Sequence, residues 1–174
     1  MTFPNVPLQN GVEFYGPEIA GAFLTSVPNN IDTFNFGVNM VADTSLPYGQ
    51  AIAYDTDGGA TIPVSGVTAV TDIAGFLPYK NNGIMEDKGM KKGGLYSSLP
   101  VLNYGRMFVP VTTGEVMVVG DTVSLNLAAG VDFNTVRKLP GAPAASDLDI
   151  STIATVAQDS NNGIVLLTIN KYLK

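Results

Sequence analysis

The acidic motif Asp55-Thr56-Asp57-Gly58 is the part of the sequence that most resembles an ion-binding loop. Two carboxylates separated by one residue and followed by glycine are typical of the start of a calcium EF-hand loop. Such a loop ends in a glutamate that binds the ion through both oxygens, and Gly66 stands where that glutamate would fall. We therefore interpret residues 55–59 as a polar β-turn and predict no metal site there.

Pairs of carboxylates could also provide the acid and the base of a glycosidase. Any chain with 15 acidic residues offers such pairs, so they carry little information on their own. The sequence has no histidine and no cysteine, which excludes Ser-His-Asp triads, thiol nucleophiles and His or Cys metal sites. We expect no catalytic residue and no cofactor, and an enzyme that uses only carboxylates or lysine is a third-ranked alternative. The candidate acids are Glu13, Glu18, Asp72, Glu86, Glu115 and Asp121.

The segment Met90-Lys91-Lys92-Gly93-Gly94 combines lysine with glycine, as phosphate-binding loops do. It lacks the two spaced glycines followed by Lys and Ser or Thr that define a P-loop. Four of the nine basic residues fall within residues 79–98, and the glycines around them predict an exposed, mobile loop. An alternative is that these lysines form a small basic patch that contacts an acidic protein surface.

Composition and charge limit the kinds of molecule that this protein is expected to bind. The net charge is −6 and the pI about 4.4, so a nucleic-acid surface or an anionic membrane surface is not expected. The first residues lack the basic and apolar regions of a signal peptide, and no run reaches the length of a membrane span. Hydrophobic residues make up 45% of the chain and charged residues 14%, which favours a globular protein that covers part of its surface in contacts.

Short apolar runs separated by turn residues predict the fold. Apolar and polar residues alternate strictly over 33–40 and 122–127, which is the pattern of a half-buried strand. An Asn161-Asn162-Gly163 turn joins two further runs in a predicted hairpin. Other predicted strands are 50–54, 67–77, 106–111 and 115–119. The sequence therefore predicts an all-β fold, a small β-barrel or sandwich of short antiparallel strands.

The domain organisation follows from the distribution of proline and glycine. Residues 1–30 are rich in both and predict an extended N-terminal arm. Residues 31–174 form the predicted β-domain, with a loop insertion at about 79–98. Two small related β-modules are an alternative to one domain, because Gly49-Gln50-Ala51-Ile52 and Gly120-Asp121-Thr122-Val123 both follow a turn and start a strand.

The second half of the chain resembles the head cement proteins of tailed bacteriophages. Pro100-Val101-Leu102 leads to Gly105-Arg106 and a valine-rich strand, as in that family. Gly120-Asp121-Thr122-Val123, followed by Gly130, is similar to a turn of the family. The ending from Asn161-Asn162-Gly163 through Ile169 resembles its closing strand. The resemblance covers roughly residues 67–174, and the basic segment at 79–98 departs from it.

The resemblance implies a structural virion protein, made in the host cytoplasm, that binds the outer surface of a phage capsid and stabilises the head. Its implied partners are the major capsid protein and neighbouring copies of itself, with no nucleic acid and no membrane. An alternative is a non-catalytic β-module that binds carbohydrate or another virion component such as a fibre. The residues that we expect to contact the capsid are Phe3, Phe14, Tyr15, Lys88, Lys91 and Lys92.

Overall fold

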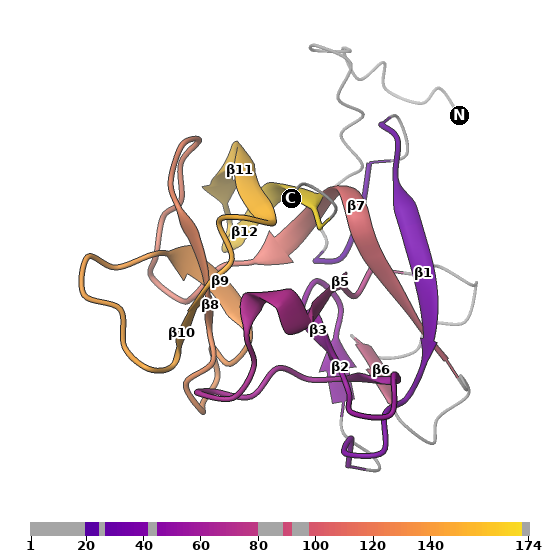
Figure 1. Ribbon diagram of the computed structural model, residues 1–174. Helices are drawn as coiled ribbons and strands as arrows, with labels where there is room; N and C mark the ends of the chain where they lie inside the picture. Colours follow the sequence, from indigo (N-terminus) through magenta and orange to yellow (C-terminus); the bar gives the residue numbers. More distant parts are fainter. Residues whose placement is uncertain (1–19, 25–26, 42–44, 80–88, 92–97, 172–174) are drawn as a thin grey trace, which may run out of the picture.

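The computed structural model describes residues 20–24, 27–41, 45–79, 89–91 and 98–171 (Figure 1). Its regular elements within these ranges are β-strands and one 3₁₀ turn, and none of the described helices is long and apolar enough to cross a membrane. The elements are β1 (Asn30–Asn35), β2 (Ser45–Pro47), β3 (Ala51–Tyr54), β4 (Ala60–Thr61), η1 (Val70–Asp72), β5 (Ile73–Phe76), β6 (Gly89–Lys91), β7 (Ser98–Pro110), β8 (Val123–Asn126), β9 (Thr135–Lys138), β10 (Asp147–Asp149), β11 (Ala154–Asn161) and β12 (Ile164–Asn170).

The strands form antiparallel sheets, which confirms the predicted all-β fold. The largest sheet has the order β11-β12-β7-β5-β3-β4, and β1 also pairs with β7. A three-stranded sheet has the order β10-β8-β9, and β2 pairs with β6. Figure 1 shows β7 running from beside β1 across the molecule to β12. This strand of 13 residues therefore joins the two ends of the fold.

A bulge at Asn103 changes which face of β7 packs into the main core, from Leu102 before it to Met107 and Val109 after it. Asn30 is opposite Tyr104 and Ile31 is opposite Leu102, so Asn103 is an extra residue in the strand. An extra residue switches the face to which the following side chains point. The Asn103 side chain is buried, donates to Asp32 Oδ2 at 2.5 Å and accepts from Asn30 Nδ2 at 2.8 Å. The bulge is thus held by polar groups that satisfy one another.

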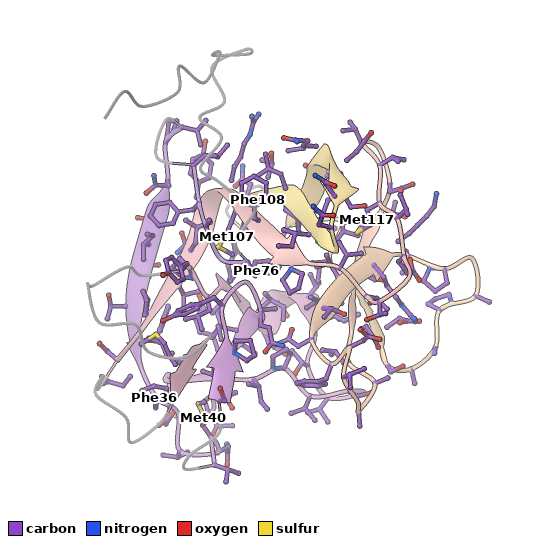
Figure 2. All side chains as sticks on the ribbon, turned by 180° about the vertical axis from the view of Figure 1, so that it is seen from behind. Phe36, Met40, Phe76, Met107, Phe108 and Met117 are labelled. Carbon is purple, nitrogen blue, oxygen red and sulfur yellow. The ribbon has the colours of Figure 1, made fainter. Side chains whose placement is uncertain are left out.

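The main core lies between the large sheet and the three-stranded sheet. Phe76 and Met107 come from the large sheet, and Val123 and Leu125 come from β8. Their burial removes apolar surface from water, which is the dominant stabilising contribution to folding. A second cluster contains Met40, Leu46, Ile52, Leu99 and Val101, among others. Figure 2 shows Phe76 and Met107 in the interior, with Phe36 and Met40 towards the end that carries β2.

The predicted closing hairpin is confirmed. β11 pairs with β12, and the turn between them places Asn162 at φ 50° and Gly163 at φ 77°. Two positive φ values suit the right-handed twist of a tight hairpin, and Asn and Gly adopt them at low cost. The strand predicted over 122–127 is also confirmed, as β8, with Val123, Leu125 and Leu127 in the main core.

Three predicted strands need correction. The strand predicted over 33–40 ends at Asn35, after which a turn leaves the Val38 side chain 67% exposed. The strand predicted over 67–77 begins only at Ile73, because residues 64–68 form a turn and η1 follows. Residues 115–119 form no strand, although Met117 is buried and its N–H donates to Ser160 Oγ at 2.9 Å.

The predicted arm and the predicted loop insertion lie largely outside the described residues. Of the arm, residues 20–24 run beside β7, where the Leu24 N–H donates to the Arg106 carbonyl at 3.0 Å and the Leu24 side chain is buried. Of the insertion, Gly89–Lys91 forms β6 instead of a loop. The division into an arm and a β-domain stays a prediction.

Candidate functional site

The acidic motif at Asp55 is a structural turn. The Gly58 N–H donates to the Asp55 carbonyl at 3.0 Å, which confirms the predicted β-turn. The Asp55 carboxylate accepts hydrogen bonds from the Asn39 N–H at 2.8 Å, the Asn39 side chain at 2.5 Å and the Thr56 N–H at 2.6 Å. Burial of the Asp55 carboxyl raises its pKa, but these hydrogen bonds outweigh burial and lower the pKa overall. Within the described ranges, no three acidic side chains gather to hold a metal ion.

Two of the candidate catalytic acids also stabilise local structure. Asp121 pairs with Lys138 at 2.6 Å, and the hydrogen bond from Lys138 is the largest cause that lowers the Asp121 pKa. Asp72 accepts a hydrogen bond from the Ala69 N–H at 2.9 Å at the start of η1. In both cases a carboxylate oxygen already bonds to another group of the same chain. Glu13, Glu18 and Glu86 lie outside the described residues.

The residues that sequence analysis assigned to capsid contact are not tested by the structure. Phe3, Phe14, Tyr15, Lys88 and Lys92 lie outside the described residues. The remaining one, Lys91, ends β6, where it is opposite Ser45 of β2. The assignment of all six stays a prediction.

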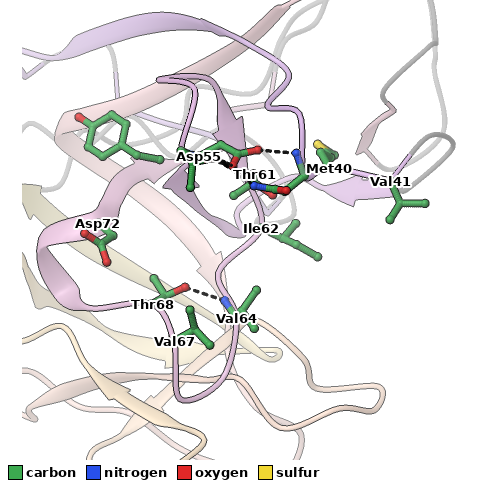
Figure 3. Close-up of a pocket in the computed structure, with 12 residues that line it drawn as sticks. Met40, Val41, Asp55, Thr61, Ile62, Val64, Val67, Thr68 and Asp72 are labelled. Carbon is green, nitrogen blue, oxygen red and sulfur yellow. Dashed lines mark hydrogen bonds between the residues drawn. The ribbon is translucent and has the colours of Figure 1, made fainter.

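An apolar groove next to β3 and β4 is the most distinctive surface feature that the structure describes (Figure 3). Its volume is about 610 Å³. Figure 3 shows Ile62, Val64 and Val67 along one loop, with Val41 on the segment that follows β1. Val41, Val64 and Val67 are 72%, 51% and 77% exposed. The other residues that line the groove are Asn39, Met40, Tyr54, Asp55, Thr56, Thr61, Thr68 and Asp72.

A second hollow adjoins the groove at Ile62. This hollow has a volume of about 270 Å³ and shares Ile62 with the groove. Val131, which is 97% exposed, lies on its wall beside Ser45 and Pro47 of β2. We name the five apolar side chains Val41, Ile62, Val64, Val67 and Val131 the valine face. In the pairing of β2 with β6, the Lys91 backbone is opposite Ser45, which lines this hollow.

Local hydrogen bonds fix the loop that presents the valine face. The Val64 N–H donates to Thr68 Oγ1 at 2.7 Å, and the Thr68 N–H donates to the Val64 carbonyl at 3.0 Å. These two hydrogen bonds close the loop and leave the side chains of Val64 and Val67 exposed to solvent. The strand predicted over 67–77 includes Val67, so the sequence did not reveal that this valine lies on a surface loop. The turn-forming pair Ser65-Gly66 between the two valines is a signal for this loop alone.

The electrostatics of the groove come from carboxylates. Asp55 and Asp72 line it, and among the residues that the structure describes no Lys or Arg does. The nearby Lys171 places Nζ 3.7 Å from the centre of the Tyr54 ring. That ammonium is buried and has no hydrogen-bond partner among the described residues. Burial lowers the pKa of Lys171 to about 8, although the charges of Asp72 and Asp32 partly raise it. The groove therefore presents apolar side chains with negative charge at its edge.

The groove offers little to a sugar ring. Protein sites that bind sugars commonly use an exposed aromatic face, and Tyr54 is the aromatic residue that lines this groove. Lys171 lies over the Tyr54 ring, and Phe34 meets it edge-on with 5.6 Å between ring centroids. Because both contacts come from the chain itself, the geometry does not favour the carbohydrate-binding alternative.

Comparison with known proteins adds two findings. The model of a family described as "Structural cement protein (E217 gp24/Pam3 gp6)" matches residues 8–170. A solved structure titled "The capsid of Myoviridae Phage XM1" contains a chain that is similar in fold, with a TM-score of 0.70 and 19% sequence identity. The alignment covers 99% of this chain and 100% of that one. No curated protein matches the sequence.

Proposed function

Because the chain belongs to the family of structural cement proteins, we propose that it binds the outer surface of an assembled phage capsid and stabilises the head. The observation that carries the proposal is the family match, which extends over residues 8–170. A fold shared with a chain from the capsid of a Myoviridae phage supports the same role. In this role the protein is part of the virion after its synthesis in the host cytoplasm.

The proposed partners are the major capsid protein and neighbouring copies of this chain. A cement protein that contacts two neighbouring subunits binds well only where both are present, so it favours the assembled shell by mass action. Because many copies bind around the shell, contacts that are individually modest together stabilise it. The net charge of −6 suits the outer side, because packaged DNA would repel an acidic protein on the inner side.

We propose a role that involves no catalysis. The carboxylates of Asp55, Asp72 and Asp121 are engaged in holding turns, and the sequence supplies no histidine or cysteine. The predicted arm, residues 1–30, fits a binding role in which a proline-rich segment reaches over a neighbouring subunit.

Co-sedimentation tests the proposal. The purified full chain is mixed with expanded capsids assembled without it and, in parallel, with isolated major capsid protein. We expect the chain to pellet with the shells up to a saturating copy number and to bind isolated subunits far more weakly. Decorated shells should also resist heat or mechanical rupture better than undecorated ones. Lack of binding to such shells, or equal binding to isolated subunits, would contradict the proposal.

A further inference from the structure

We infer that the valine face is the surface that docks on the capsid, and that its partner there presents apolar side chains flanked by lysine or arginine. The inference rests on the proposed function and adds which surface is used and what it meets. The valine face consists of Val41, Ile62, Val64, Val67 and Val131, as defined above.

Exposed apolar side chains gather around the groove and the hollow that adjoins it. Single exposed valines are normal on a protein surface and need no explanation. Here Val41, Val64 and Val67 surround one groove of about 610 Å³, and Val131 lines the hollow next to it. Exposed apolar side chains that gather around hollows with polar edges are typical of a protein–protein contact.

The segments that carry Val41, Val64 and Val67 are preorganised by hydrogen bonds within the chain. The side chain and N–H of Thr68 both bond to Val64, so the loop that carries Val64 and Val67 is closed before any partner arrives. On the other side of the groove, two hydrogen bonds from Asn39 to Asp55 hold the segment that leads to Val41. Binding to a surface that is already formed loses less conformational entropy, which favours affinity.

The charge at the groove selects the partner. Asp72 is exposed at the groove, and none of the described Lys or Arg residues lines it. The ammonium of Lys171 is buried over Tyr54 and so does not offset these carboxylates at the surface. In a symmetric contact between two copies, the same patch meets itself, and Asp72 would approach its own counterpart. Like charges oppose that contact, whereas a partner with a basic rim gains complementarity.

A second group of exposed valines lies in the loop before β8. Val116 and Val119 are 71% and 61% exposed there. The backbone N–H groups of Val118 and Val119 donate to Asp121 and Asp159, so this loop is also fixed. These valines line neither the groove nor the second hollow. They serve instead as a matched control.

The experiment compares valine-to-glutamate variants at the two places. Val67→Glu and Val131→Glu each add one negative charge to the valine face, at positions 77% and 97% exposed, where substitution leaves the core intact. Val116→Glu makes the same change at a position 71% exposed outside the face. The binding of each full-length variant to expanded, undecorated shells is measured by co-sedimentation titration. Circular dichroism and thermal melting check that each variant folds.

We expect Val67→Glu and Val131→Glu to weaken shell binding by about tenfold or more, and Val116→Glu to bind like wild type. Wild-type-like binding by both face variants, or an equal loss in Val116→Glu, would overturn the inference and leave the proposed function standing. Absence of binding by the wild type itself would remove the proposed function and the inference together. A wild-type oligomer in solution that Val67→Glu dissociates would show that a second copy occupies the face, which also overturns it.

Discussion

The carboxylate of Asp55 accepts hydrogen bonds from both the backbone N–H and the side-chain amide of Asn39, at 2.8 and 2.5 Å. These bonds join the turn after β1 to the turn between β3 and β4. The two turns flank the groove, so this pair fixes one wall of the valine face. A motif that resembles an ion-binding loop in the sequence is thus used to shape a surface.

The Asp55→Asn variant tests this relationship through pH. Hydrogen bonds lower the pKa of Asp55 in the folded state, so its carboxylate stabilises the fold fully above the unfolded pKa of about 4. That stability is lost as the pH falls through the lower, folded pKa. We expect the variant to be less stable than wild type at pH 6 and the difference to shrink at pH 3. Urea unfolding at both pH values measures this difference in stability. A difference that stays constant with pH would contradict the prediction.

Gly75 shows why the middle of the large sheet requires glycine. Its φ is +150°, and a Cβ built there would lie 2.3 Å from the Leu102 carbonyl oxygen of β7. Backbone atoms of a central strand cannot move away, so the clash adds to the conformational strain. We expect Gly75→Ala to lower the free energy of unfolding by about 3 kcal/mol or more. Denaturant unfolding measures the change.

Gly66 provides the matched control for Gly75. Its φ is +70°, but a Cβ there meets nothing within 4 Å. Gly66→Ala therefore carries only the cost of a left-handed conformation, about 1 kcal/mol. Equal losses in the two variants would show that the close approach to β7 contributes nothing.

The titration of Lys171 makes the free energy of unfolding depend on pH in the alkaline range. Burial lowers its pKa to about 8 in the folded state, against an ordinary value of 10.5. Between these values the unfolded chain holds more protons than the folded chain, so stability rises with pH. We expect wild type to become more stable from pH 8 to pH 9.5 and Lys171→Met to lack this rise. Chemical unfolding across that range measures it. Parallel profiles for the two proteins would show that Lys171 is not the titrating group.

The sequence predicted those elements whose pattern is set by local rules. The alternation in β8 and the Asn162-Gly163 turn need only the period of a strand and the φ preferences of two residues. The polar turn at Asp55 was predicted for the same reason. Alternation misled at Val38, because tertiary contacts end β1 at Asn35 and the chain turns towards Asp55. The residue at which a strand ends depends on its pairing with neighbouring strands, and a single sequence does not show that pairing.

The valine face could not be predicted because it is assembled from distant segments. Val41 follows β1, Val64 and Val67 lie between β4 and η1, and Val131 lies between β8 and β9. In the sequence each is an ordinary apolar residue next to a turn. The bulge at Asn103 was equally hidden, since its signature is a pair of partly buried side-chain hydrogen bonds to β1. The resemblance to cement proteins, in contrast, depended on the order of short motifs and is confirmed by the family match.

Removing the charge of Asp72 tests the electrostatic part of docking. Asp72→Asn keeps an oxygen that can accept the hydrogen bond from the Ala69 N–H, so η1 should be preserved. An ion pair at the rim of a contact contributes about 0.2–1 kcal/mol. We therefore expect shell binding to weaken about two- to fivefold at low salt, and the difference to vanish at high salt, where charges are screened. Asp149→Asn is the control, because Asp149 is also exposed and accepts a backbone hydrogen bond, from Ser151, at 2.9 Å. If both variants lost affinity equally, the effect would reflect net charge, and a specific basic partner at Asp72 would be ruled out.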